Sequence, residues 1–293
     1  MNNKQIRRFK ELLALSPKEK VLITLKYIIL ISLTILFLIP LLWTISGSLK
    51  SSGRIFTVPI EWIPETFHWE NYTNLIDRFP FFKYAANSLI IVGFNMVFTT
   101  VSSLLVAYGF ARFKHPWNQR IFIFVLATMM IPSQVTLIPQ FLIFSKLNWV
   151  DTYLPLIVPN LFGNAFNIFL MRQFIMGIPR SLDESAYIDG ANSFKILTKI
   201  IAPLCMPVII TIAVFTFNSN WNDFMGPLIY LSSQSKYPLQ LALYTLDAGR
   251  QGVTDFGMMF AGSIIALIPP MVLFIFLQKH IMAGVKIGGS IKG

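Results

Sequence analysis

The sequence has few charged residues and few of the residue types on which soluble chemistry depends. Only 13% of its 293 residues are charged, about half the fraction found in soluble domains. It has one cysteine, Cys205, which permits no internal disulfide, and three histidines that do not lie at metal-ligand spacing. This composition excludes a disordered chain and a disulfide-stapled secreted module, and we predict no metal site and no catalytic residues.

What the sequence has in abundance is long apolar segments. Hydrophobic residues make up 55% of the chain, and the mean hydropathy is +0.63. A membrane-spanning helix needs about 20 mostly apolar residues, and six uncharged stretches reach that length. We therefore predict an all-α membrane protein whose six transmembrane helices lie at about 27–49, 86–110, 121–143, 152–171, 202–226 and 257–278. The first stretch is too long for a cleaved signal peptide, so we expect it to remain as a span.

The distribution of basic residues predicts the orientation of these spans. If the N-terminus lies inside, 17 of the 24 Lys and Arg residues fall in the inner segments, as the positive-inside rule requires. The formal net charge of +11 therefore reflects membrane topology, and we expect no nucleic-acid partner. The predicted organisation is a cytoplasmic segment 1–26, a membrane domain 27–280 and a cytoplasmic tail 281–293, in contact with the lipid bilayer.

The most informative segment is the cytoplasmic loop between the fourth and fifth spans, residues 178–200. Ser181 and Glu184 have the S-x-x-E spacing of a capping box, which predicts a helix that begins after Ser181. Gly190 stands where a helix end favours a left-handed residue, and Asn192 or Ser193 is suited to cap a second helix. An ordered, exposed helical hairpin without a nucleophile or metal ligands suits docking to another protein.

This loop resembles a known signature. Glu184, Ser185 and Ala186, followed by Gly190, Ile200 and Pro203, are similar to the EAA motif, EAA-x3-G-x9-I-x-L-P. The motif is found in the permease subunits of binding-protein-dependent ABC importers. The sequence departs from it at Ser185, which replaces alanine, and at Ala202, which replaces leucine; the spacing is unchanged.

The resemblance extends over nearly the whole chain and narrows to the sugar importers. It is carried by Asn87-Ser88, Ala107-Tyr108, Ala111-Arg112, Ile178-Pro179, Ile188-Asp189-Gly190, Trp221-Asn222, Pro227-Leu228 and the ending from Gly284 to Gly293. Together these are similar to the second permease of the maltose-type carbohydrate importers. The resemblance implies the type I ABC importer permease fold, with both termini cytoplasmic, in the cell membrane of a prokaryote.

The resemblance also implies a non-catalytic subunit that works within an assembly. The implied partners are a second permease subunit, two ATP-binding-cassette ATPases and an extracytoplasmic binding protein that delivers a sugar. The sequence contains no G-x-x-x-x-G-K-[ST] phosphate loop, so ATP and Mg²⁺ are expected on the ATPases and no cofactor on this chain. The residues expected to couple to the ATPase are Ser181, Glu184, Ser185, Ala186, Asp189, Gly190 and Pro203. A further ATPase contact is implied for Lys286, Gly288, Lys292 and Gly293.

Polar residues inside the spans are candidates for the sugar pathway. Asp223 is the acidic residue that touches a predicted span, and ionisable groups at membrane depth are often functional. Amides bind sugar hydroxyls and an indole stacks on a sugar ring, so the candidates are Asn164, Asn167, Asn218, Asn220, Trp221, Asn222 and Asp223. The alternative is hydrogen bonding between helices, which is favoured slightly for Asn218 and Asn222. Pro203 has the alternative role of starting the fifth span.

Two other functions remain open from the sequence. A secondary transporter would need ionisable relays inside the membrane and usually inverted repeats, and neither is detected. An intramembrane enzyme or an assembly factor is a more distant alternative. Within the importer class, the solute could be another polar compound such as a polyol.

Overall fold

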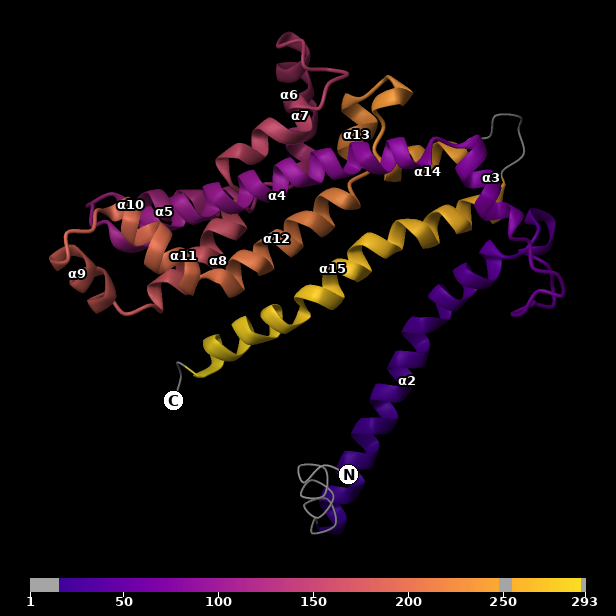
Figure 1. The fold of residues 1–293 in the computed structure, drawn as a ribbon, viewed down its shortest axis with the longest axis horizontal. Helices are drawn as coiled ribbons and strands as arrows, with labels where there is room; N and C mark the ends of the chain where they lie inside the picture. The colour runs from indigo at the N-terminus through magenta and orange to yellow at the C-terminus, as the bar shows by residue number, and fades with distance from the viewer. Residues whose placement is uncertain (1–15, 248–254, 291–293) are drawn as a thin grey trace. The chain divides into compact units, whose positions relative to one another are not determined.

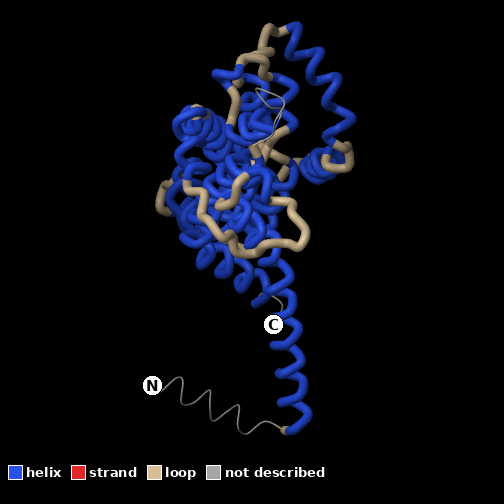
Figure 2. The backbone as a smooth tube through the Cα atoms, turned by 90° about the vertical axis from the view of Figure 1, so that its right-hand side faces the viewer, coloured by secondary structure: helices blue, strands red, loops and turns tan. Residues whose placement is uncertain are grey.

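The computed structural model describes residues 16–247 and 255–290, with side chains described as far as residue 279. Within these ranges the protein consists of helices joined by loops and contains no strand (Figures 1 and 2). The contacts divide the chain into two compact units, one formed by residues 1–72 and 256–264 and the other by residues 73–255 and 265–293.

The apolar stretches form helices, but two of the six are sharply bent. Four helical stretches in the described residues are long and apolar enough to cross a membrane: α2 (Pro17–Ser48), α4 (Phe81–Arg112), Leu154–Met176 and the part of α15 (Phe256–Ser290) up to Lys279. The expected span 121–143 is instead a pair, α5 (Asn118–Thr128) and α6 (Ser133–Lys146), bent by 93°. The expected span 202–226 belongs to a second pair, Ser193–Leu204 and α12 (Met206–Trp221), bent by 78°. The number of spans reaches six when each bent pair counts as one.

Prolines account for both bends. Pro132 precedes the first residue of α6 and has the extended backbone of a helix cap, so it ends the preceding turn. Pro203 and Pro207 lie on either side of the break at Cys205, where each lacks the amide hydrogen that a continuous helix would use. Other prolines, including Pro40 and Pro139, stay inside their helices.

The first unit begins with a capped helix. The Ser16 hydroxyl accepts from the Glu19 amide (3.3 Å), and the Glu19 carboxylate accepts from the Ser16 amide (2.8 Å). This capping box starts α2 at Pro17, about ten residues before the expected span, because nothing in residues 17–26 interrupts the helix. Most of α2 is exposed within the protein, as expected for a helix whose surroundings are lipid or another subunit.

The C-terminal end of α2 packs closely within the first unit. A methyl group added at Gly47 would lie 2.2 Å from the Phe260 ring of α15, so only glycine fits there. The Asn71 amide donates to the carbonyl oxygens of Ser48 (2.9 Å), the last residue of α2, and of Lys50 (2.8 Å), which follows the helix. These bonds satisfy carbonyl groups that a helix end leaves unpaired. The 3-10 turn η1 (Ser52–Arg54) follows.

The second unit is built around α4. Figure 1 shows α8 (Ala165–Met176) and α12 along α4, and both helices contact it extensively. The shared core is sealed by fully buried residues: Ala107 on α4, Met171 on α8, Ile212 on α12, and Ile201 and Cys205 before α12. The remaining elements are α3 (Glu70–Arg78), α7 (Leu154–Ile157), η2 (Val158–Phe162), α9 (Ser181–Ile188), α10 (Ser193–Ile196), η3 (Leu197–Ile201), α11 (Ala202–Leu204), α13 (Met225–Tyr230), η4 (Gln234–Lys236) and α14 (Leu239–Asp247).

Asp151 fastens two loops of the second unit together. Its carboxylate accepts from the amides of Ser232 (3.0 Å) and Ser233 (2.9 Å), from the Ser233 hydroxyl (2.6 Å) and from Lys236 Nζ (2.9 Å). These hydrogen bonds hold the pKa of Asp151 below its usual range, and those from Ser233 have the largest effect on it. The loop before α7 is thereby held against the loop after α13.

Candidate functional site

The loop after α8 folds into a helical hairpin, defined here as residues 178–196. It consists of α9, a tight turn and α10. Gly190 adopts a φ of +78°, and its amide donates to the Tyr187 carbonyl (3.0 Å) while that of Ala191 donates to Ala186 (2.9 Å). The side chain of Asn192 accepts from the Lys195 amide (2.8 Å) and caps α10. The predicted roles of Gly190 as a left-handed helix end and of Asn192 as a cap are confirmed.

The predicted capping box at Ser181 and Glu184 is wrong. Arg180 already has helical backbone angles, and its carbonyl accepts from the Glu184 amide (3.1 Å). Ser181 is therefore the first residue of α9 rather than its cap, and no side chain caps this end. Because Pro179 lies one residue earlier, the chain turns into the helix sooner than the S-x-x-E spacing suggests. The Glu184 side chain is left exposed.

Two arginines tie the hairpin to the end of α4. Arg112, the last residue of α4, forms an ion pair with Asp183 on α9 (2.6 Å) and donates to the Ile178 carbonyl (3.0 Å). Arg180 donates in the opposite direction, to the Ala111 carbonyl (3.1 Å). The ion pair is buried, with side-chain exposures of 7% and 10%. Burial raises the pKa of Asp183, and the nearby arginines oppose that shift.

The base of the hairpin belongs to the hydrophobic core. Ala186 of α9, Ile196 of α10 and Leu197 are buried in the same cluster as Ala107 and Tyr108 of α4. The hairpin therefore rests on α4 through apolar packing as well as through the arginines. The base of the hairpin is therefore held in place by packed side chains.

The outer face of the hairpin is exposed and apolar. Figure 1 shows α9 beside α10 and α11, at one end of the helices α4, α8 and α12. Four large side chains of the hairpin are exposed: Ile188 (87%), Phe194 (68%), Tyr187 (49%) and Leu182 (42%). Glu184, Ser185 and Asp189 are exposed beside them, whereas Ala186 points into the core. A cluster of this kind marks an interaction surface.

Pro203 does not start the fifth span. It lies in α11, after the π-helical segment η3, and the spanning helix α12 begins at Met206 beyond the bend at Cys205. The hairpin and α12 are therefore joined through a bent, irregular connection. Pro203 contributes to that bend by removing a backbone donor.

A polar layer inside the second unit repairs a break in the fourth span. The helix changes from α7 to the tighter η2 and breaks at Gly163, which has a φ of +80°. Asn95 of α4, fully buried, donates to the Leu156 carbonyl (2.9 Å) and to Asn220 of α12 (2.5 Å). Freed carbonyls at membrane depth need such partners. Asn220 therefore holds helices together.

The other amide candidates have different settings. Asn164 caps α8, since its side chain accepts from the Phe166 amide (2.9 Å), and Asn167 is buried. Asn218 and Asn222 are exposed, and the Asn222 amide donates to Asn218 Oδ1 (3.0 Å) along the same helix. Asn222 Oδ1 also accepts a long hydrogen bond from Gln240 Nε2 of α14 (3.4 Å), so the favoured alternative of bonding between helices holds for Asn222 and not for Asn218. Both remain available to a ligand.

Trp221 and Asp223 have structural partners. Trp221 is 2% exposed, stacks on Phe217 (5.6 Å between ring centroids) and donates to the Ala266 carbonyl (3.0 Å). Its indole face is therefore covered. The Asp223 carboxylate accepts from the Gly226 amide (3.1 Å) and shapes the turn between α12 and α13.

The proposed C-terminal contact falls largely outside the described side chains. Lys286 and Gly288 lie in the last part of α15, where only the backbone is described, and Lys292 and Gly293 lie outside the described residues. The helical backbone of α15 continues to Ser290.

Several residues of the site escaped the sequence analysis. The Arg112–Asp183 pair joins positions 71 residues apart, and no local pattern signals it. Asn95 was not considered, although a polar residue in the middle of the second apolar stretch was a usable signal. Ile188 and Phe194 could have been found as large apolar residues in the loop between the fourth and fifth predicted spans.

Comparison with known proteins gives one consistent answer. Residues 100–287 match the family of binding-protein-dependent transport system inner membrane components. The arabinooligosaccharides transport system permease protein AraQ of Bacillus subtilis (strain 168) is 32% identical over 264 residues, covering 89% of this chain and 92% of that protein. The osmoprotective compounds uptake permease protein GgtD of Synechocystis sp. (strain ATCC 27184 / PCC 6803 / Kazusa) is 31% identical over 274 residues, covering 91% of each.

A solved structure shares the fold. A chain of a bacterial ABC transporter involved in the import of the acidic polysaccharide alginate superposes with a TM-score of 0.79 at 23% identity, covering 90% of this chain and 98% of that one. At this identity the similarity shows the fold alone. The expected ABC importer permease fold is confirmed.

Proposed function

The chain belongs to the family of binding-protein-dependent transport system inner membrane components, and from this we propose that it is the permease subunit of an ATP-driven importer for a sugar or oligosaccharide. The observation that carries the proposal is the hairpin 178–196. It presents exposed apolar side chains, and its buried Asp183 is paired with Arg112 at the end of the spanning helix α4. Such a surface is suited to receive force from another protein and pass it to the membrane domain.

The hairpin docks on the ATPase. Ile188 and Phe194 provide apolar contact area, while Glu184 and Asp189 present carboxylates beside them. Ser181 and Ser185 are exposed on the same helix, and Gly190 sets the angle between the two arms. ATP and Mg²⁺ are held by the ATPase subunits, and this chain contributes coupling rather than catalysis.

The assembly contains a second permease, two ATPases and an extracytoplasmic binding protein. The exposed apolar faces of α2 and of the bent pair α5–α6 support contact with lipid or with the second permease. Both termini lie on the cytoplasmic side of the cell membrane, as the distribution of basic residues indicates. Lys286, Gly288, Lys292 and Gly293 provide a further contact with the ATPases.

A sugar is the favoured solute. The relative named for arabinooligosaccharides supports a carbohydrate, and the exposed amides Asn218 and Asn222 offer donors and acceptors for hydroxyl groups. The relative named for osmoprotective compounds keeps a smaller polar solute as the second candidate. Uptake of labelled oligosaccharides and of polyols by the same assembly separates the two.

The docking surface is tested by removing one apolar side chain. Ile188→Ser is expected to lower both uptake and the ATPase activity stimulated by the loaded binding protein at least tenfold, because the central residues of an interface carry most of its binding energy. Ile63→Ser is the matched control, since Ile63 is 80% exposed and lies in the loop between η1 and α3, outside the hairpin.

Insertion and assembly are measured by co-purification, so that loss of the subunit is distinguished from loss of coupling. Normal stimulated ATPase activity and uptake in Ile188→Ser would contradict the docking role. Uptake that follows an ion gradient without ATP would instead indicate a secondary transporter.

A further inference from the structure

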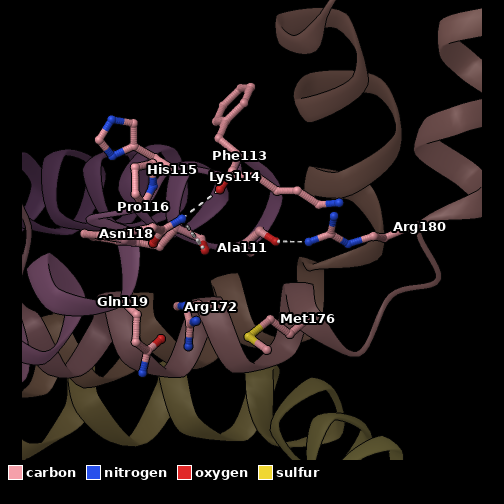
Figure 3. A pocket seen from close by; sticks show the side chains of 11 residues that line it. Ala111, Phe113, Lys114, His115, Pro116, Asn118, Gln119, Arg172, Met176 and Arg180 are labelled. Atoms are coloured by element: carbon pink, nitrogen blue, oxygen red, sulfur yellow. Dashed lines mark hydrogen bonds between the residues drawn. The ribbon is translucent and has the colours of Figure 1, made fainter.

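A basic pocket lies in the second unit, beside the hairpin. It has a volume of about 460 Å³ and is bounded by the end of α4, the following loop, the start of α5 and the end of α8 (Figure 3). Lys114, Arg172 and Arg180 line it, and no aspartate or glutamate is among the lining residues. Three positive charges without a carboxylate favour an anionic ligand.

The positive charges in this pocket are only partly neutralised by the surrounding protein. Asp183, the buried acidic residue of the adjoining hairpin, lies outside the pocket, where it is paired with Arg112 and also attracts Arg180. The Arg172 guanidinium lies 4.1 Å from the centre of the Phe122 ring, and its buried Nε has no hydrogen-bond acceptor among the described residues. Arg180 donates to the Ala111 carbonyl, as Figure 3 shows. Donors of both guanidinium groups are therefore left for a ligand.

The pocket also contains an acceptor that needs a donor. The Asn118 amide nitrogen donates to the carbonyls of Phe110 (3.3 Å) and Phe113 (2.7 Å). Its Oδ1 is buried and has no partner among the described residues. A buried acceptor left unpaired is costly. A ligand that carries hydroxyl groups as well as negative charge satisfies both the arginines and this amide.

We propose that this pocket binds the head group of an anionic phospholipid, with the phosphodiester among Lys114, Arg172 and Arg180 and a head-group hydroxyl donating to Asn118. The aromatic and basic residues beside the pocket opening favour a lipid over a soluble phosphate as the ligand. Phe113 and Trp117 are 51% and 54% exposed, and Arg120 lies 5.0 Å from the Trp117 ring. Aromatic and basic residues gather in this way at membrane surfaces. The location at the cytoplasmic surface rests on the proposed function.

The proposal is tested by native mass spectrometry of the purified transporter complex. We add phosphatidylglycerol, phosphatidylcholine or inorganic phosphate and compare wild type with Lys114→Gln and Arg172→Gln. Phosphatidylglycerol is expected to bind selectively, and each variant is expected to weaken it about fivefold, which corresponds to about 1 kcal/mol per basic residue near the membrane surface. Arg172→Lys keeps the charge and is expected to retain most of the binding. Lys146→Gln, an exposed lysine outside the pocket, is the matched control.

Other outcomes would overturn the proposal. Equal binding of phosphatidylcholine would show that the charges do not select the ligand, and binding of inorganic phosphate that displaces the lipid would identify a soluble anion. A zero-length cross-link from Lys114 to a carboxylate of the ATPase would show that a protein fills the pocket. Lipid binding is measured without transport, so its loss is distinguishable from failure of the proposed function, which uptake reports.

Discussion

Removing one partner of the Arg112–Asp183 pair is expected to release the hairpin from α4. Breaking a buried ion pair by removing one partner costs about 3–5 kcal/mol, because the remaining charge is left buried. Asp183→Asn keeps the shape of the side chain and removes its charge. Asp183 Oδ1 already lacks a hydrogen-bond partner among the described residues, so the native pair is incompletely compensated. We therefore expect a cost near the lower end, about 3 kcal/mol.

A loss of this size has a direct readout in hydrogen exchange. The amides of residues 181–196 are expected to exchange roughly 100-fold faster in Asp183→Asn, since each 1.4 kcal/mol is a factor of ten in the opening equilibrium. The measurement uses the assembled transporter. Asp77→Asn is the matched control, because Asp77 is exposed on α3, lies outside the hairpin and forms no ion pair within the described residues.

A double substitution separates the lost charge from lost packing. Arg112→Met combined with Asp183→Leu removes both charges, and replacement of a buried pair by apolar residues is often neutral. We expect this variant to recover most of the protection that Asp183→Asn loses. Unchanged exchange in Asp183→Asn, or equal loss in the double variant, would refute the assignment of the pair as the clamp.

Three further expectations concern other parts of the protein. Gly190→Ala should destabilise the hairpin by about 1 kcal/mol because of its φ of +78°, measured by the same exchange experiment; no change would refute the strain argument. Asn95→Leu should lower the thermal midpoint through loss of about 0.6–2 kcal/mol of interhelical hydrogen bonding, whereas Asn222→Leu, which removes only exposed hydrogen bonds with Asn218 and Gln240, should lower it less. The folded protein lowers the pKa of Asp151, so the stabilisation from its carboxylate is complete above the ordinary pKa of about 3.9 and is lost as the pH falls through the lowered pKa. The thermal midpoint of the wild type should therefore fall with acid. The thermal midpoint of Asp151→Asn should already be low at neutral pH and should vary less with pH.

The locations of the apolar segments and of the hairpin could be predicted from the sequence because their signals are local. A spanning helix is visible as an uncharged run. The turn at Gly190 and the cap at Asn192 follow from residues that favour these conformations over a few neighbouring positions. The composition was also enough to separate this protein from soluble classes.

The bends and the clamp could not be predicted because they depend on distant or competing contacts. Prolines occur in most of the apolar runs, yet Pro40 lies inside a helix while Pro132 precedes a 93° bend. The Ser181 spacing favoured a cap, but the turn at Pro179 had already started the helix. The stacking role considered for Trp221 failed for a similar reason, since burial against Phe217 is a tertiary property.

The two arginines that link α4 and the hairpin restrict the movement of the hairpin relative to α4. Arg112 of α4 donates to the backbone of the hairpin, and Arg180 of the hairpin donates to the backbone of α4. We therefore expect a displacement of α9 to move the end of α4 with it. The connection to the fifth span is different, because the chain turns by 78° at Cys205 before α12. Under the proposed function, we therefore expect a displacement of the hairpin to reach α4 directly and α12 only through this bend.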